Sequence, residues 1–452
     1  MKVFGWQPRV ARQYGKLVAG GIGLMALLPS AAAQAQTTDS LTVAQVVQAT
    51  LGAQPTVRRD QANQLVAAAQ VGQSRSGFYP RAALTGSYTY LQPTGYLAFP
   101  GADGNLSKVY INPHNNYSGQ LAVSYTLLDF GRRRTNLSLA QSQQLSAEQQ
   151  LRLTKQDLAN QAIRTYYTIL FLQHTLQVQD QQLAALQRNL GQVERRAAQG
   201  TATKFDLLTI QTRIASVRNV QIQLRSDIDR QQIQLRSLMG LPEGAPLPLS
   251  QRADTAPLAL PAADSLLAQS YRQRVEVQLS RTGEEAARLQ TVLAGQNARP
   301  SVNVFANGGT ANGYQPNIDR MRGTFQSGVS LNVPVFTGYQ NRYEQAGARA
   351  GQQVATARTE EARRQVSLDV RQSLTTLRAL DDKLANTRVQ VAQAEEAARR
   401  ARISYANQLV TNLDLLNAEV ALAAAHDDYW QAVYNRKLAT YDLQRATGTP
   451  LY

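Results

Sequence analysis

The 452-residue chain contains no cysteine, which excludes a disulfide framework, a thiolate metal site and a lipid anchor on an N-terminal cysteine. Its three histidines, His114, His174 and His426, lie far apart in the sequence. His426 adjoins Asp427 and Asp428, but this pattern is more typical of a solvated helix face than of a metal site. The sequence also lacks a phosphate-cradling glycine loop and any nucleophile motif. We therefore expect no metal, no cofactor and no enzymatic activity.

Long hydrophobic runs are missing as well. Beyond the first 35 residues, no apolar stretch reaches the length of a transmembrane helix. Residues 1–35 have a basic start, an apolar core from Leu17 to Leu28 and an Ala33-Gln34-Ala35 cleavage site, which is typical of a secretory signal peptide. A non-cleaved anchor is the alternative interpretation. If the mature chain enters a membrane, the sequence predicts that it does so as a β-barrel.

Acidic residues are outnumbered, and the net charge is +16. Removing residues 1–35 removes four positive charges, which lowers +16 to +12. The remaining arginines and lysines are spread along helical stretches rather than clustered, which favours a solvated face over a nucleic-acid surface. An exported chain also has little access to nucleic acid, so we expect no nucleic-acid partner.

An internal duplication covers nearly all of the mature chain. The motif Thr-x-x-Asp-Leu-Leu occurs at Thr203 to Leu208 and again at Thr411 to Leu416. Each copy begins with a helical segment that ends in proline, continues with two strand-like runs and a very long helical pattern, and closes at Gly240 or Gly448. The predicted fold class is therefore α+β with mostly long α-helices, built from two copies of one unit.

The duplication sets the predicted boundaries. We expect a signal peptide at 1–35, a first repeat at 36–241, a linker at 242–261 and a second repeat at 262–452. The first repeat is predicted to hold strands at about 82–92 and 117–128 and helices at about 132–199 and 204–239. The second is predicted to hold strands at about 301–307 and 324–335 and helices at about 339–406 and 412–446.

The strand-like runs alternate with a period of two. In Ala82 to Tyr90, apolar or aromatic residues at even positions alternate with Thr and Ser at most odd positions, and the other three runs behave similarly. This alternation predicts a sheet with one apolar and one polar face, although a soluble half-buried sheet would alternate in the same way. Strand lengths near ten residues, aromatic residues toward strand ends and the export signal favour a transmembrane barrel. Four strands cannot close such a barrel, so several chains must contribute.

The helical stretches are unusually long. From Arg132 to Gln199 there is no proline, and this length corresponds to about 100 Å of helix. Leu176, Leu183 and Leu190 repeat every seven residues, which predicts coiled-coil packing. A second seam consists of alanines that would let helices approach closely, namely Ala418, Ala425, Ala432 and Ala439. The helices alone would equally suit an extended coiled-coil stalk.

Several motifs in a fixed order carry a resemblance to a known family. They are Leu41 to Val47 followed by Gln54-Pro55, Pro80 before the first strand, Leu128 to Arg133, Gly200 to Leu208, and Leu238 to Pro242. With these motifs and its duplication, the mature chain resembles the outer-membrane efflux proteins of the TolC type. The resemblance implies a homotrimer in which each chain gives four strands to a twelve-stranded outer-membrane β-barrel and helices to a twelve-helix periplasmic α-barrel.

The resemblance also implies a function and partners. The chain would be a passive exit duct of a tripartite efflux or type I secretion system, in the bacterial outer membrane with a large periplasmic portion. Its partners would be a periplasmic adaptor (membrane fusion protein), an inner-membrane pump and outer-membrane lipid. The loops Tyr96 to Asn115 and Gly308 to Arg322 would be extracellular, and residues 242–261 would be the linker of the equatorial region. A periplasmic coiled-coil adaptor or structural stalk is the alternative.

The repeated motif has a structural interpretation of its own. Thr203 and Asp206, like Thr411 and Asp414, have the spacing of a capping box that closes the start of a helix. The resemblance adds that acidic residues here narrow the periplasmic aperture, which points to Asp206 and Asp414 as gate residues. We expect three copies of Asp414 to form an acidic ring.

Three further positions follow from the resemblance. Tyr405 matches a tyrosine that helps to tie the closed mouth, Asn417 stands where a second acidic ring is expected, and Val410 replaces an arginine of the closing network. We expect a closed state that is held more weakly or differently, and an aperture that is less cation-selective.

The tips of the two hairpins are candidates for adaptor docking. The predicted docking residues are Gly200, Thr201, Ala202, Leu409 and Val410, with Leu409 and Val410 expected to be exposed. Gly200 can adopt the left-handed conformation that a turn between helices requires. Because its counterpart Gln408 lacks that freedom, we expect the second turn to differ slightly.

Overall fold

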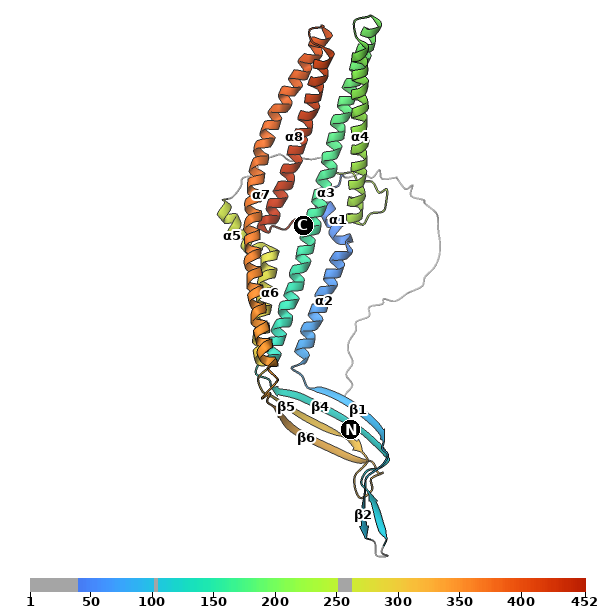
Figure 1. The fold of residues 1–452 in the computed structure, drawn as a ribbon, viewed down its shortest axis with the longest axis vertical. Coiled ribbons are helices and arrows are strands. Elements are labelled where there is room, and N and C mark those ends of the chain that lie inside the picture. The colour runs from blue at the N-terminus through green and yellow to red at the C-terminus, as the bar shows by residue number, and fades with distance from the viewer. Residues whose placement is uncertain (1–39, 101–104, 251–261) are drawn as a thin grey trace, which may run out of the picture. The chain divides into compact units, whose positions relative to one another are not determined.

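The computed structural model describes residues 40–100, 105–250 and 262–452 (Figure 1). The predicted signal peptide at 1–35 lies outside the described residues, as does the part of the predicted linker from 251 to 261.

The helices recur in the same order and with the same lengths in the two repeats. The first repeat contains α1 (Val43–Ala53), α2 (Pro55–Ser76), α3 (Arg132–Ala198) and α4 (Lys204–Met239). The second contains α5 (Ala263–Gln273), α6 (Val275–Gln296), α7 (Gln340–Ala406) and α8 (Asn412–Thr447). In both repeats these helices have 11, 22, 67 and 36 residues. The structure therefore contains the duplication at the level of whole elements.

The strands lie between the second and third helices of each repeat (Figure 1). They are β1 (Arg81–Tyr90), β2 (Tyr96–Pro100), β3 (Leu106–Tyr110) and β4 (Asn115–Leu128) in the first repeat, and β5 (Ser301–Ala311) and β6 (Arg322–Asn332) in the second. β1, β4, β5 and β6 form one antiparallel sheet in the order β1-β4-β5-β6, and β2 pairs with β3 in a separate hairpin.

The two long hairpins, α3–α4 and α7–α8, pack against each other through α3 and α8. An aromatic and aliphatic cluster fills this contact and includes Ile163, Tyr166 and Leu170 of α3 and Tyr434 of α8. The Tyr166 hydroxyl donates to the carbonyl oxygen of Leu41 at 3.1 Å, near the start of the first repeat, or to that of Ser250 at 2.8 Å, in the predicted linker. The predicted alanine seam lies on this helix, with Ala425, Ala432 and Ala439 buried.

The strand register gathers the alternating residues of all four strands onto one face. Leu84 pairs with Leu121, Leu121 with Gly308 and Gly308 with Phe325, so one row of this face crosses the whole sheet. Other side chains of the face are Tyr88, Tyr117, Val123, Tyr125, Val302, Val304, Val329 and Leu331. The face is therefore mostly apolar, with Asn115, Thr310 and Ser327 as its polar members. Its side chains are largely exposed in the single chain, with Leu84 at 83% and Phe325 at 77%.

The opposite face of the sheet is polar and nearly uncharged. Its residues are Arg81, Ala83, Thr85, Ser87 and Thr89 of β1; Asn116, Ser118, Gln120, Ala122, Ser124 and Thr126 of β4; Ser301, Asn303, Phe305, Asn307, Gly309 and Ala311 of β5; and Arg322, Thr324, Gln326, Gly328, Ser330 and Asn332 of β6. Hydroxyl and amide groups bond across it, as between Ser87 and Ser118 at 2.8 Å and Thr126 and Asn303 at 2.8 Å. Arg81 and Arg322 stand at strand ends and carry its charge.

Three strand predictions need correction. β5 runs to Ala311 instead of about 307, because glycine at 309 lets the strand approach β4: a Cβ there would lie 2.1 Å from the Gly119 carbonyl oxygen. β6 ends at Asn332 instead of about 335, since Pro334 has no N–H to donate to the ladder. The predicted loop from Tyr96 to Asn115 contains the β2–β3 hairpin, in which Leu97 pairs with Val109.

Within the part of the chain that the structure describes, every helix is too short or too polar to cross a membrane.

Candidate functional site

The tips of the two helical hairpins have the same backbone geometry. At the end of α3, the N–H of Gly200 donates to the Ala197 carbonyl at 3.0 Å and the N–H of Thr201 donates to the Arg196 carbonyl at 2.9 Å. At the end of α7, the corresponding pairs are Gln408 with Tyr405 at 3.1 Å and Leu409 with Ser404 at 2.8 Å. Both ends are Schellman motifs, which satisfy the last free carbonyls of a helix.

The expectation that the second turn would differ was wrong. Gln408 has φ of 62° and Gly200 has φ of 75°, so both residues adopt the left-handed conformation. The hydrogen bonds of the Schellman motif hold Gln408 there, although a side chain makes this conformation unfavourable by about 1 kcal/mol. The two turns therefore share one backbone conformation, and the replacement of glycine by glutamine appears as backbone strain at Gln408.

Both capping boxes form at the starts of α4 and α8. The Thr203 hydroxyl donates to an Asp206 carboxylate oxygen at 2.6 Å and accepts from the Asp206 N–H at 3.1 Å. Thr411 and Asp414 repeat the arrangement at 2.7 and 3.2 Å. The hydrogen bonds from the Thr411 hydroxyl and backbone N–H hold the pKa of Asp414 below its usual range. Each carboxylate thus has a structural role at a helix start.

An apolar cluster lies beneath the tips and joins all four long helices. Its buried members are Leu186 and Val193 of α3, Ile210, Ile214 and Val217 of α4, Tyr405 of α7, and Leu415 and Leu416 of α8. Ala202 and Val410, from the two turns, pack against it. The prediction that Val410 is exposed therefore needs correction, because its side chain covers this cluster. Leu409 is 75% exposed, as expected.

Sequence reasoning missed two residues at the tips. Phe205, in the first turn of α4, is 75% exposed, as much as Leu409. Arg196, at the end of α3, reaches across to the end of α7. The apolar residue next to a cap could have indicated Phe205, but Arg196 is one of many arginines on these helices and no local pattern distinguishes it.

Arg196 connects the two hairpin tips. Its guanidinium donates to the carbonyl oxygens of Tyr405 at 2.9 Å and Ala406 at 3.2 Å, and lies 4.4 Å from the centre of the Tyr405 ring. A cation at the last carbonyls of a helix is favourable because these carry the negative end of the helix dipole. Burial raises the pKa of Tyr405, with the Arg196 charge opposing it, so the phenol stays neutral beside the cation. The predicted gate residue Tyr405 is thus held by an arginine of the other repeat.

Two polar contacts lie farther along the same junction. Arg402 of α7 makes a bidentate contact with Glu419 of α8 at 2.5 and 2.8 Å. The buried Asn189 of α3 donates to Asn412 of α8 at 2.9 Å. Arg402 and Glu419 line a groove between α3 and α8 whose volume is about 350 Å³.

The other predicted gate residues are not brought together within one chain. Asp414 and Asn417 are exposed, and Asp206 is half-buried. Among the residues that the structure describes, no hydrogen bond joins Asp206 to Asp414, and each bonds to its own threonine. A ring formed from these residues would require several copies of the chain.

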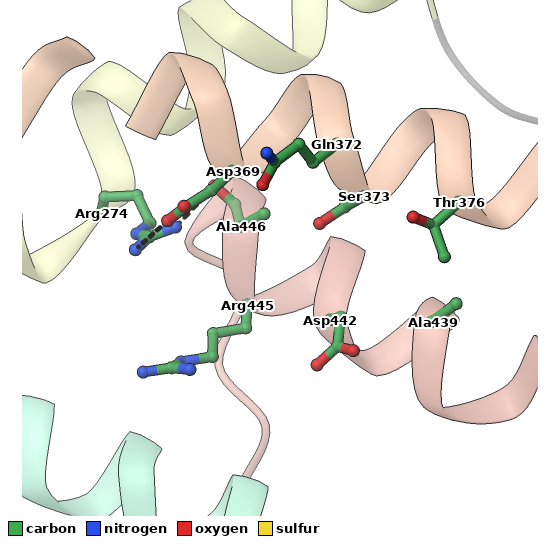
Figure 2. A pocket seen from close by; sticks show the side chains of 9 residues that line it. All are labelled: Arg274, Asp369, Gln372, Ser373, Thr376, Ala439, Asp442, Arg445 and Ala446. Atoms are coloured by element: carbon green, nitrogen blue, oxygen red, sulfur yellow. Dashed lines mark hydrogen bonds and ion pairs between the residues drawn. The ribbon is translucent and has the colours of Figure 1, made fainter. Parts of the chain in front are cut away.

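A charged cavity of about 290 Å³ lies farther from the tips, between α7 and α8 (Figure 2). Arg274 on its wall contacts Glu276 at 2.9 Å and Asp369 at 3.0 Å, and Arg445 contacts Asp157 at 2.7 Å. Because these arginines are paired with carboxylates of the chain itself, we interpret the cavity as part of the packing contact between helices and not as a ligand site. In the described ranges, no three His, Cys, Asp or Glu side chains are grouped to hold a metal ion.

Comparisons with known proteins agree with this architecture. A family model described as outer membrane efflux protein matches residues 46–241 and 266–449. The chain is 25% identical to the proteases secretion protein PrtF of Dickeya chrysanthemi, over 84% of this chain and 82% of that protein. It is 22% identical to the outer membrane protein TolC of Escherichia coli, over 90% of this chain and 82% of that protein. The crystal structure of VceC from Vibrio cholerae has a TM-score of 0.77 at 20% identity, over 91% of this chain and 97% of that one. The resemblance inferred from the motifs is confirmed.

Proposed function

This chain belongs to the outer membrane efflux protein family, and we therefore propose that it is a passive exit duct that docks with a periplasmic adaptor and an inner-membrane pump. Family membership implies a location in the outer membrane. The proposal contains no catalytic step: the duct would conduct molecules that the pump delivers.

The observation that carries the proposal is the mostly apolar, exposed face that extends across all four strands of the β1-β4-β5-β6 sheet. Exposed side chains such as Leu84, Phe325 and Val329 would be unfavourable in water, whereas hydrocarbon would solvate them. Among the strands that the structure describes, β1 and β6 each have one edge without a partner strand. Unpaired edges are unfavourable in hydrocarbon, since their backbone groups have no partner.

Three copies of the chain would remove both problems. The β6 edge of one chain would pair with the β1 edge of the next, and three sets of four strands would close a twelve-stranded barrel. The polar face would then line the lumen and the apolar face would contact lipid. The long hairpins would assemble alongside one another as a periplasmic tunnel.

At the far end of this tunnel, the hairpin tips would form the gate. Arg196 and Tyr405 would hold the two tips of each chain together, and Asp414 from three chains would narrow the aperture. The exposed Leu409 and Phe205 would be the apolar contacts for the adaptor.

The duct is tested with the purified protein in detergent and in planar bilayers. We expect an outer-membrane protein that migrates as an SDS-resistant trimer and forms ion-conducting channels. A protein recovered in the soluble periplasmic fraction would contradict the duct and favour the adaptor or stalk alternative.

The gate and docking residues are tested separately. Asp414→Asn should reduce cation selectivity and block by multivalent cations, with Asp229→Asn, which removes an exposed carboxylate of α4 away from the tips, as the control. Leu409→Asp should abolish cross-linking to the adaptor without changing conductance. Unchanged selectivity in the first variant, or unchanged cross-linking in the second, would remove the assigned role.

A further inference from the structure

Phe305 is the one aromatic side chain on the polar face of the sheet. The neighbours along β5 on this face are Asn303 and Asn307, and the cross-strand partners of Phe305 are Ser124 of β4 and Gly328 of β6. A large apolar group among amides and hydroxyls needs an explanation, because contact with water gives it no favourable interaction.

The glycine opposite explains how the ring fits. A Cβ placed on Gly328 would lie 2.9 Å from Cζ and 3.1 Å from Cε1 of Phe305, so the ring occupies the space of a missing side chain. A matching pair exists on the apolar face of the same two strands, where Phe325 lies opposite Gly308, at 3.7 Å from the corresponding Cβ position. Covering glycine with an aromatic ring stabilises a sheet, and this structural role accounts equally well for both pairs.

The two pairs differ in what surrounds them. Phe325 is 77% exposed on a face of apolar side chains, where hydrocarbon is the expected surrounding. Phe305 is half-buried, with one side of its ring on the strand of Gly328 and the remainder open among polar groups. A stabilising ring could have been placed on the apolar face alone. The polar face therefore presents an aromatic surface at a single row.

The same row contains a positive charge. Arg81 of β1 pairs with Ser124, and Ser124 pairs with Phe305, so Arg81 and Phe305 lie two strands apart on one face. This spacing corresponds to about 10 Å, within reach of one small aromatic molecule. Arg81 and Arg322 are the charged residues of this face, and the row of Phe305 contains no acidic residue.

We propose that Phe305 and Arg81 form a contact site in the lumen of the duct for amphipathic anions that carry an apolar or aromatic group. The ring contacts the apolar part of the passing molecule and the guanidinium contacts its anionic group. This proposal rests on the proposed function, since it takes the polar face as the lumen. The site slows such molecules during passage and does not bind them tightly, because one ring and one charge contribute only modestly.

Single-channel recording with small, water-soluble probes tests the site. The probes are 1-naphthalenesulfonate and methanesulfonate, two anions that differ in the aromatic group, and naphthylmethylammonium, an aromatic cation. The probes are added to the compartment of the bilayer chamber into which the end of the channel formed by the sheet opens. We expect 1-naphthalenesulfonate to interrupt the current for about fivefold longer than methanesulfonate, which is the range of one aromatic contact. It should also interrupt the current for longer than naphthylmethylammonium.

Phe305→Ser and Phe325→Ser are matched variants, because each uncovers one glycine of the same strand pair on opposite faces. Phe305→Ser should shorten the 1-naphthalenesulfonate events to those of methanesulfonate, whereas Phe325→Ser should leave them unchanged. Arg81→Gln should remove the preference for the aromatic anion over the aromatic cation. Equal events in the wild type and Phe305→Ser would overturn the proposal, as would equal shortening in both phenylalanine variants. A wild type that forms no channels would instead overturn the duct itself.

Discussion

α4 and α8 are the same helix in two copies of the repeat, and their surroundings differ. Both have 36 residues, begin at a Thr-Asp capping box and end at a left-handed glycine. Leu416 of α8 is 2% exposed, whereas Leu208, its counterpart 208 residues earlier, is 53% exposed. Likewise Trp430 of α8 is half-buried and Ile222 of α4 is 64% exposed.

This difference separates features that a few consecutive residues determine from features that packing partners determine. Turns and caps depend on a few consecutive residues, and they are the same in both copies. Burial depends on partners: α8 packs on both α7 and α3, while α4 packs mainly on α3 and on the short α1. By the symmetry of the repeat, the missing partner of α4 corresponds to α7. In the proposed trimer, α4 of one chain would therefore pack on α7 of the next, where Val389 and Ile403 are exposed in the single chain.

The largest expected effect comes from placing a charge on each helix in turn. Leu416→Asp buries a carboxylate within the chain and should destabilise the fold by about 3–5 kcal/mol. Leu208→Asp places the same charge on a surface that is exposed in the single chain, so it should leave the chain folded and prevent trimer formation. Circular dichroism on heating measures the first effect, and electrophoresis of unheated samples in SDS measures the second.

The comparison would fail if both variants unfolded the chain equally, or if Leu208→Asp still formed trimers. Arg213→Asp, at an exposed position five residues beyond Leu208, serves as the control for adding negative charge to α4.

The second prediction breaks the connection between the tips. Arg196→Ala removes two hydrogen bonds to the end of α7 and the cation beside Tyr405, which should weaken the contact between the two tips by about 2 kcal/mol. Arg195→Ala, at the exposed neighbouring position, is the matched control. The chain has no cysteine, so single cysteines at Lys204 and Asn407 can carry spin labels whose separation reports opening. Equal separations in the two arginine variants would contradict the role of Arg196.

The same division explains what the sequence could predict. The ends of the long helices follow from Thr203, Thr411 and the glycines that close α4 and α8, because these signals act within one turn of the chain. The apolar face of the sheet follows from alternation, since the register joins like positions. The contact of Arg196 with the end of α7 and the packing of Val410 over the apolar cluster could not be predicted, because each depends on a helix that is distant in sequence.

Gln408 shows a further limit of local reasoning. Its residue type argued against a left-handed turn, yet the surrounding hydrogen bonds impose one. Likewise the β2–β3 hairpin could not be predicted. It lies in a segment with several Gly and Pro residues, and its five-residue strands are too short to show a clear alternation of apolar and polar residues.

The third prediction exchanges the residues of the two turns. Gly200→Gln should destabilise the first tip by about 1 kcal/mol, and Gln408→Gly should stabilise the second by a similar amount, because only glycine adopts positive φ without strain. The space around Gly200 is open, so the backbone conformation alone sets the cost. Thermal unfolding of the two variants and the double variant measures both effects. Shifts of the same sign would show that the turns differ by more than this residue.

The smallest effect is expected from a carboxyl group that only the second copy buries. Asp427 of α8 accepts a hydrogen bond from the Gln179 side chain of α3 at 3.2 Å, while its counterpart Asn219 on α4 is exposed. Burial, with a smaller contribution from the charge of Asp428, raises the pKa of Asp427 to about 6, and the hydrogen bond from Gln179 opposes this shift. Its ordinary value is 3.8, so the folded chain holds this proton more tightly than the unfolded chain does.

The sign of the pH effect follows from this difference. The contribution of Asp427 to stability is greatest below about pH 4 and is lost as the pH rises through about 6, since ionisation then leaves a charge in the α3–α8 contact. Asp427→Asn should therefore stabilise the chain relative to the wild type near pH 7.5 more than near pH 5, by a small amount because the carboxyl group is only partly buried. Asn219→Asp, which adds an acid at the exposed position of α4, should show no such dependence. If the two variants shifted thermal unfolding alike at both pH values, the α3–α8 contact would not distinguish the copies in this respect, and the burial of α8 would have to act through its apolar side chains alone.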